Sequence, residues 1–203
     1  MMLRKVPRAV TEAAQQYLHA TYLDYERSAR AAAHRLGRVL TSNTALGAYD
    51  SESASKQGCF LRMISVVEAY VDIVSAALFR ETAPTTDDLV RRLVEQAELR
   101  ASTTWSERKD AFERYHQIKL GQLARWSELD AGIEVRNTIA HGLGQLTHKQ
   151  RSGSAARKMS SIGVGLSDSR ILITDAGLQR CRDICLDFIR SLDEASQATA
   201  AGS

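Results

Sequence analysis

The chain has 203 residues, of which 44% are hydrophobic and 25% charged, with only 2 prolines and 12 glycines. This composition is typical of a globular domain large enough to bury a core, with room for long helices and few tight hairpins. The formal net charge of +3 permits contact with phosphate but does not indicate a surface that binds nucleic acid mainly through charge.

The three cysteines, Cys59, Cys181 and Cys185, are an odd number and lack paired metal-ligand spacing. They indicate neither a disulfide framework nor a zinc site, so we expect buried thiols in a reducing cytoplasm and no catalytic metal or cofactor. The basic segment Met1–Val10 is not followed by an apolar stretch, and no run of 18 apolar residues occurs. The sequence therefore predicts neither secretion nor a membrane span.

Two long helices are predicted in the first half of the chain. Residues 11–40 are rich in good helix formers, with Thr11 as a candidate N-cap, and the polar residues 41–55 indicate a loop. From roughly Ser55 to Glu81, apolar residues recur at the spacing of one buried helix face. This stripe consists of Phe60, Ile64, Val67, Val71, Val74 and Leu78.

Two shorter helices follow. Pro84 is expected to stop the chain, and Thr85 or Thr86 with Asp87 and Asp88 predicts a capped third helix to about Arg100. A fourth helix is predicted from near Thr104 to Leu120. Its expected aromatic anchors are Trp105, Phe112 and Tyr115.

The last third of the chain predicts a helix, a hairpin and a final helix. Ser127, with Asp130 three residues later, resembles a capping box that opens a helix over about 127–141. Apolar segments flanking Ser167-Asp168-Ser169 predict a β-hairpin over about 161–173. Thr174-Asp175 is expected to cap a last helix to about Leu192, and residues 194–203 are expected to be disordered. We thus predict one all-α domain over residues 1–193, a helical bundle with a small hairpin before its last helix.

The segment Arg136-Asn137-Thr138-Ile139-Ala140-His141-Gly142-Leu143-Gly144 places a guanidinium and an imidazole where the fifth helix should end. Arg136 shares a helix face with Leu129, Gly132, Ile133 and Ala140, so it is predicted to lie on the packed face. A buried guanidinium is very costly without a carboxylate, a partner chain or a ligand anion beside it. We select Glu68 as the carboxylate that orients Arg136.

His141 is expected in the last turn of this helix. Gly142 is predicted to take the left-handed conformation that ends a helix, which would let the imidazole approach Arg136. Such a pair suits metal-free RNA cleavage, because an acid/base of near-neutral pKa can move protons at the ribose 2′-oxygen and the leaving 5′-oxygen. Arg136 would neutralise the charge that develops on the phosphoryl oxygens.

The pattern Arg136-Asn137-x-x-x-His141 resembles the signature of HEPN domains, and Ile139-Ala140-His141-Gly142-x-Gly144 followed by Leu146-Thr147 is similar to their RiboL-PSP branch. The resemblance implies an all-α bundle, a homodimer with two motifs across one cleft, and metal-independent endoribonuclease activity. It also implies a toxin or anti-phage defence effector, with an antitoxin or another defence component as partner. By position, Arg136 and His141 would be catalytic and Asn137 would support them.

The basic stretch after the motif supplies candidate RNA-binding residues, namely Lys149, Arg151, Arg157 and Lys158. Two alternatives to a nuclease stay open. The same cleft could bind RNA, a nucleotide or a protein without cutting it. The motif could also complete the interface of a structural or regulatory dimer, with Arg136 in an ordinary ion pair.

Overall fold

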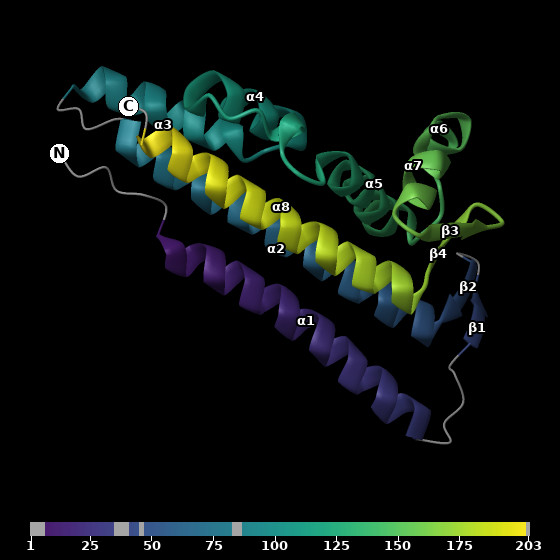
Figure 1. Cartoon of the computed structure of the whole chain (residues 1–203). Helices are drawn as coiled ribbons and strands as arrows, with labels where there is room; N and C mark the ends of the chain where they lie inside the picture. The colour runs from purple at the N-terminus through teal and green to yellow at the C-terminus, as the bar shows by residue number, and fades with distance from the viewer. Residues whose placement is uncertain (1–6, 35–40, 45–46, 83–86, 202–203) are drawn as a thin grey trace. The chain divides into compact units, whose positions relative to one another are not determined.

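The computed structural model describes residues 7–34, 41–44, 47–82 and 87–201, and Figure 1 labels most of the elements formed by them. The elements are α1 (Arg8–His34), β1 (Thr41–Thr44), β2 (Gly47–Asp50), α2 (Ser51–Thr82), α3 (Asp88–Ala101), α4 (Trp105–His116), a 3₁₀ turn (Leu120–Gln122), α5 (Trp126–Gly142), α6 (His148–Ser152), α7 (Ala155–Ser161), β3 (Val164–Ser167), β4 (Arg170–Ile173) and α8 (Asp175–Ala201). The predicted all-α fold class with a small hairpin before the last helix is confirmed. Within the described ranges, no helix is long and apolar enough to cross a membrane.

The chain divides into two compact units. Unit 1 comprises the described residues among 1–15, 67–126 and 187–203, and unit 2 those among 16–66 and 127–186. The predicted single domain thus contains two centres of packing. The helices α1, α2 and α8 each contribute one segment to unit 1 and one to unit 2.

In unit 1, a buried hydroxyl joins the three long helices. Thr11 Oγ1 lies 3.1 Å from the Tyr70 hydroxyl on α2 and donates a hydrogen bond of 2.7 Å to Asp193 Oδ1 on α8. Because α1 begins at Arg8, Thr11 lies within the helix and is not the predicted N-cap. The prediction that this helix reaches residue 40 extends outside the described residues, since the described part of α1 ends at His34.

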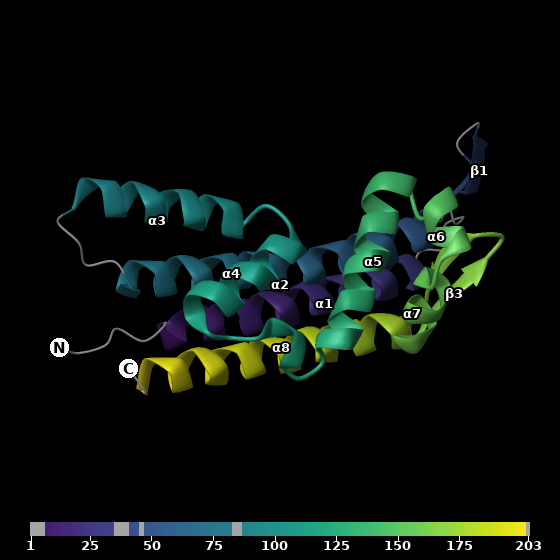
Figure 2. The same ribbon diagram turned by 90° about the horizontal axis from the view of Figure 1, so that it is seen from above.

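The other helices of unit 1 are short and begin with side-chain caps. The side chain of Asp87 accepts hydrogen bonds from the backbone of Leu89 and Val90, as the predicted cap requires, and Thr104 caps α4. The predicted contributions of Pro84, Thr85 and Thr86 lie outside the described residues. In both views α3 runs beside the C-terminal half of α2 (Figures 1 and 2).

The fourth helix ends earlier than predicted. Gln117 takes the left-handed conformation, with φ of 57°, so α4 ends at His116 and not near Leu120. Among the expected anchors, Phe112 is fully buried and Trp105 is half-buried. Tyr115 is 45% exposed, so its prediction as an anchor was wrong.

In unit 2, polar and aromatic contacts hold the same three long helices. Tyr25 on α1 donates to Asp175 Oδ1 on α8, and Lys56 on α2 pairs with the same carboxylate at 3.6 Å. α5 approaches α2 closely at Gly132, where an added Cβ would lie 3.0 Å from Ile64 Cδ1. The predicted stripe of α2 from Phe60 to Leu78 is buried at every position, which confirms the helical period.

Of the two hairpins in the structure, one was predicted from the sequence and the other was not. β3 and β4 pair antiparallel with Val164 opposite Ile173, and Asp168 and Ser169, with φ of 49° and 64°, form the predicted turn. The predicted loop over residues 41–55 was wrong, because β1 and β2 pair there and α2 begins at Ser51. Asp50 explains the early start, since its carboxylate accepts hydrogen bonds from the backbone N–H groups of Glu52 and Ser53.

The last helix also extends further than predicted. Thr174 Oγ1 accepts a hydrogen bond of 3.0 Å from the Gly177 backbone, as a cap should, but α8 continues past Leu192 to Ala201. Ser196 is buried there, so most of the segment expected to be disordered is helical. The three cysteines are buried as predicted, and burial raises the pKa of the Cys59 thiol to about 11.

Candidate functional site

The motif helix α5 packs against the rest of unit 2 through one face. Leu129, Gly132 and Ile133 are buried on this face, as the helical spacing predicts. Ala140 is exposed and Arg136 is half-buried. Arg136, which the spacing predicts on the packed face, is thus partly covered there.

The end of α5 differs from the predicted glycine stop. The helix runs through Gly142, and Leu143 and Gly144 take the left-handed conformation with φ of 50° and 83°. The Gly144 backbone N–H then donates to the Thr138 carbonyl at 3.2 Å. His141 is thus exposed in the last turn of a regular helix, where Glu134, Asn137 and His141 share one face at positions i, i+3 and i+7.

A pocket of about 370 Å³ lies against this face, entirely within unit 2. α5 contributes Glu134, Asn137 and His141, and α7 contributes Lys158. The remaining lining residues are Thr147, Gln150, Gly153, Ser154 and Ala155. The structure therefore brings together three of the predicted residues, His141, Asn137 and Lys158.

Arg136 is not among the residues that line this pocket. Its Nη1 donates a hydrogen bond of 3.1 Å to Asn137 Oδ1. Asn137 lines the pocket, so within one chain this amide links the guanidinium to the pocket. A direct approach of Arg136 and His141 to one anion stays a prediction.

Glu68 makes a different contact from the one predicted. Its Oε1 accepts a hydrogen bond of 2.9 Å from the Trp105 indole N–H, and both residues belong to unit 1. Arg136 belongs to unit 2. Its pairing with Glu68 stays a prediction.

The predicted RNA-binding residues lie on helices. Lys149 and Arg151 are in α6, and Arg157 and Lys158 are in α7. Lys158 Nζ donates a 2.7 Å hydrogen bond to Asp130 Oδ2, and this carboxylate raises the pKa of the lysine. Arg151 and Arg157 are exposed and do not line the pocket.

Glu134, Thr147 and Gln150 line the pocket but were missed in the sequence. Thr147 Oγ1 accepts from the Gln150 backbone while Gln150 Oε1 accepts from the Thr147 backbone, which makes a capping box for α6. The Gln150 amide then donates to Thr138 Oγ1 at 2.7 Å and to Glu134 Oε2 at 3.3 Å. The Thr-x-x-Gln spacing could have indicated this helix start.

The pocket combines an imidazole, an ammonium group, a carboxylate and two side-chain amides. The imidazole can exchange a proton near neutral pH, the ammonium group attracts anions, and the amides can orient a polar ligand. Among the residues that the structure describes, no group of three or more His, Cys, Asp or Glu side chains is arranged to hold a metal ion. This is a site suited to a small anionic or nucleotide-sized ligand.

Comparisons of the chain with protein-family models, with curated proteins and with solved structures found no match.

Proposed function

We propose that this protein is a metal-independent endoribonuclease of HEPN type that acts in the cytoplasm as a toxin or an anti-phage defence effector. The observation that carries the proposal is the grouping of His141, Asn137 and Lys158 around one pocket on the motif helix. Acid/base, orienting and cationic groups are the parts that RNA cleavage by the ribose 2′-oxygen requires.

In this proposal the substrate is RNA, with one phosphate between His141 and Lys158. A base removes the proton of the 2′-OH, the 2′-oxygen attacks the adjacent phosphorus, and the bond from phosphorus to the 5′-oxygen breaks. The leaving 5′-oxygen takes up a proton, so the products carry a 2′,3′-cyclic phosphate and a 5′-OH. His141 serves as one proton-transfer group because it is exposed and lines the pocket, and imidazole is the side chain that most often transfers protons in catalysis.

Arg136 acts in one of two ways that experiment can separate. Within one chain it holds the Asn137 amide through the 3.1 Å hydrogen bond and so positions the pocket. In the homodimer implied by the resemblance, a second copy would place its own motif across the cleft and complete the charge around the phosphate. An antitoxin or another defence component would keep such a nuclease silent.

The test is cleavage of a mixed-sequence RNA in EDTA by the wild type and by His141→Ala and Arg136→Ala. We expect His141→Ala to lower the cleavage rate by about 100-fold or more, since a proton-transfer group contributes about that much. Gly142→Ala is a matched control because an added Cβ there meets nothing within 4 Å. Full activity in folded His141→Ala, or a wild type that needs a divalent metal, would contradict the proposal.

A second candidate is a non-catalytic module that binds RNA, a nucleotide or a protein in the same pocket. The absence of Arg136 from the pocket lining favours this candidate, because the cation assigned to phosphate neutralisation does not reach the pocket directly. It predicts that a 5′-labelled RNA binds without being cut and that Lys158→Ala weakens binding.

A further inference from the structure

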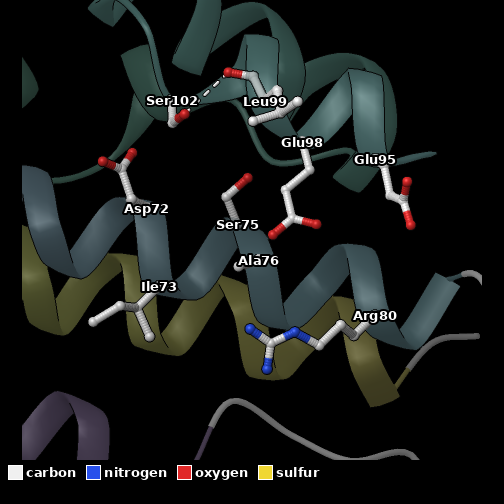
Figure 3. Close-up of a pocket in the computed structure, with 9 residues that line it drawn as sticks. All are labelled: Asp72, Ile73, Ser75, Ala76, Arg80, Glu95, Glu98, Leu99 and Ser102. Carbon is white, nitrogen blue, oxygen red and sulfur yellow. Dashed lines mark hydrogen bonds between the residues drawn. The ribbon is translucent and has the colours of Figure 1, made fainter. Parts of the chain in front are cut away.

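Unit 1 contains a second cavity, a groove of about 600 Å³ between α2 and α3 (Figure 3). We call it the α2–α3 groove. Its α2 side contains Ser75 and Ala76, and its α3 side carries Glu95, Glu98 and Leu99. None of these residues lines the pocket beside His141, so the groove is a separate feature of the molecule.

A buried hydroxyl faces the groove. Ser75 is only 4% exposed, and its Oγ finds no hydrogen-bond partner among the described residues. Figure 3 shows this hydroxyl pointing from α2 toward α3, with the Glu98 carboxylate extending from α3 toward α2. Buried polar atoms in folded proteins are nearly always satisfied, so this hydroxyl is an unusual polar group in the wall of the groove, although its oxygen is covered by the protein itself.

Apolar side chains border the same region. Leu99 is 70% exposed at the rim of the groove, and Ile73 on α2 is about half exposed. Leu89, Val90 and Leu93 are also exposed along α3, which packs on unit 1 mainly through Val94, Ala97 and Ala101. Leu99 and Ile73 line the groove, whereas Leu89, Val90 and Leu93 lie on another side of α3, so the apolar border of the groove consists of Leu99 and Ile73.

The charge of the groove is acidic. Asp72 is already engaged, because both of its carboxylate oxygens accept hydrogen bonds of 2.8 Å from Arg108. Glu95 and Glu98 remain on the α3 wall, while the guanidinium of Arg80 is turned away from α3 (Figure 3). An occupant that complements this wall must carry positive charge beside an apolar surface.

We propose that the α2–α3 groove, with Leu99 and Ile73 at its border, binds a basic amphipathic helix of a partner protein. The apolar stripe of that helix covers Ile73 and Leu99, as helices do in hydrophobic grooves. Its lysine or arginine side chains meet Glu95 and Glu98.

The test uses two synthetic helical peptides that share one leucine stripe and differ in their flanking residues, lysine in one and glutamate in the other. Fluorescence anisotropy with the full-length protein should show binding of the lysine peptide and binding at least about tenfold weaker for the glutamate peptide. The double substitution Glu95→Lys/Glu98→Lys should weaken binding of the lysine peptide by about tenfold. Glu113→Lys, on the exposed surface of α4, is the matched control and should leave the affinity unchanged.

Leu99→Gln provides an independent variant, because it removes the apolar rim without changing the charge of the groove. This variant should also weaken binding of the lysine peptide. Circular dichroism verifies that each variant stays helical. Equal binding of the two peptides, or wild-type affinity in Glu95→Lys/Glu98→Lys, overturns the proposal. Absent peptide binding overturns it as well, and self-association lost in Leu99→Gln would then assign the surface to a second copy of this chain.

Discussion

Unit 1 and unit 2 each place a histidine and a basic side chain together, but in contrasting environments. Unit 1 buries Arg108 to 7% exposure and His116 to 4%, the first in a two-bond pair with Asp72 and the second between Phe79 and Phe112. Unit 2 leaves His141 and Lys158 exposed at a pocket. Burial without a charged partner lowers the pKa of His116 to about 4, so this imidazole is neutral near pH 7.

The difference teaches that a strongly perturbed group need not mark a functional site. His116 has a pKa far from its ordinary value because it serves as a packed aromatic ring, touching Phe79 with a 4.6 Å distance between ring centroids. His141 lies where a ligand can reach it. Accessibility and neighbouring polar groups, more than the pKa shift, distinguish the candidate site from the core.

The largest expected effect is on the buried ion pair of unit 1. Asp72→Ala leaves the Arg108 guanidinium buried without its carboxylate, which should lower the free energy of unfolding by about 3–4 kcal/mol. Chemical denaturation monitored by circular dichroism measures the change. Asp110→Ala, at an exposed position on the same helix as Arg108, should cost almost nothing. Equal losses would show that the buried pair does not stabilise unit 1 in this way.

His116 should make stability depend on pH. The pKa of His116 is about 4 in the folded protein, against an ordinary value of 6.5. As the pH falls, the unfolded chain therefore takes up a proton at His116 before the folded protein does. The contribution of neutral His116 to the free energy of unfolding is complete above about pH 6.5. It is lost as the pH falls toward 4, and the total loss is up to about 3 kcal/mol. His116→Phe should remove this part of the pH dependence in thermal melts from pH 4 to 7, whereas His141→Ala should retain it.

A smaller effect is expected at the pocket of unit 2. Thr147→Ala removes the capping box of α6 and should destabilise that turn by about 1 kcal/mol. Faster hydrogen exchange at the backbone of Gln150 and Arg151 would report it. Ser154→Ala is the matched control, since the Ser154 side chain makes no capping hydrogen bond to α7. If both variants exchange alike, the cap does not hold the pocket.

The smallest expected effect is on RNA binding, when two neighbouring basic residues of α7 are substituted in turn. Lys158→Ala should weaken RNA binding about threefold to fivefold because Lys158 lines the pocket, while Arg157→Ala should change it less. Filter binding at two salt concentrations measures both. A larger loss for Arg157→Ala would place the RNA on the outer surface of α7 and not in the pocket.

The sequence predicts the parts of the fold that depend on local periodicity and turns. The stripe from Phe60 to Leu78 and the turn at Asp168 are examples, because spacing and turn residues suffice to define them. Asp50 and Thr147 were missed as helix starts, since a polar residue in a polar segment also suits a loop. The pocket that Asn137 and His141 share with Gln150 and Lys158 depends on how α5, α6 and α7 pack together, which no local pattern encodes.

The tryptophans and the cysteines lie in different units, so they can serve as separate spectroscopic and chemical reporters of unfolding. Both tryptophans, Trp105 and Trp126, belong to unit 1, with ring centroids 5.8 Å apart, and all three cysteines are buried in unit 2. Intrinsic fluorescence therefore follows the melting of unit 1, and the rate of thiol labelling by a colorimetric reagent follows the opening of unit 2. One unlabelled sample can thus reveal whether the two units unfold in concert or in succession.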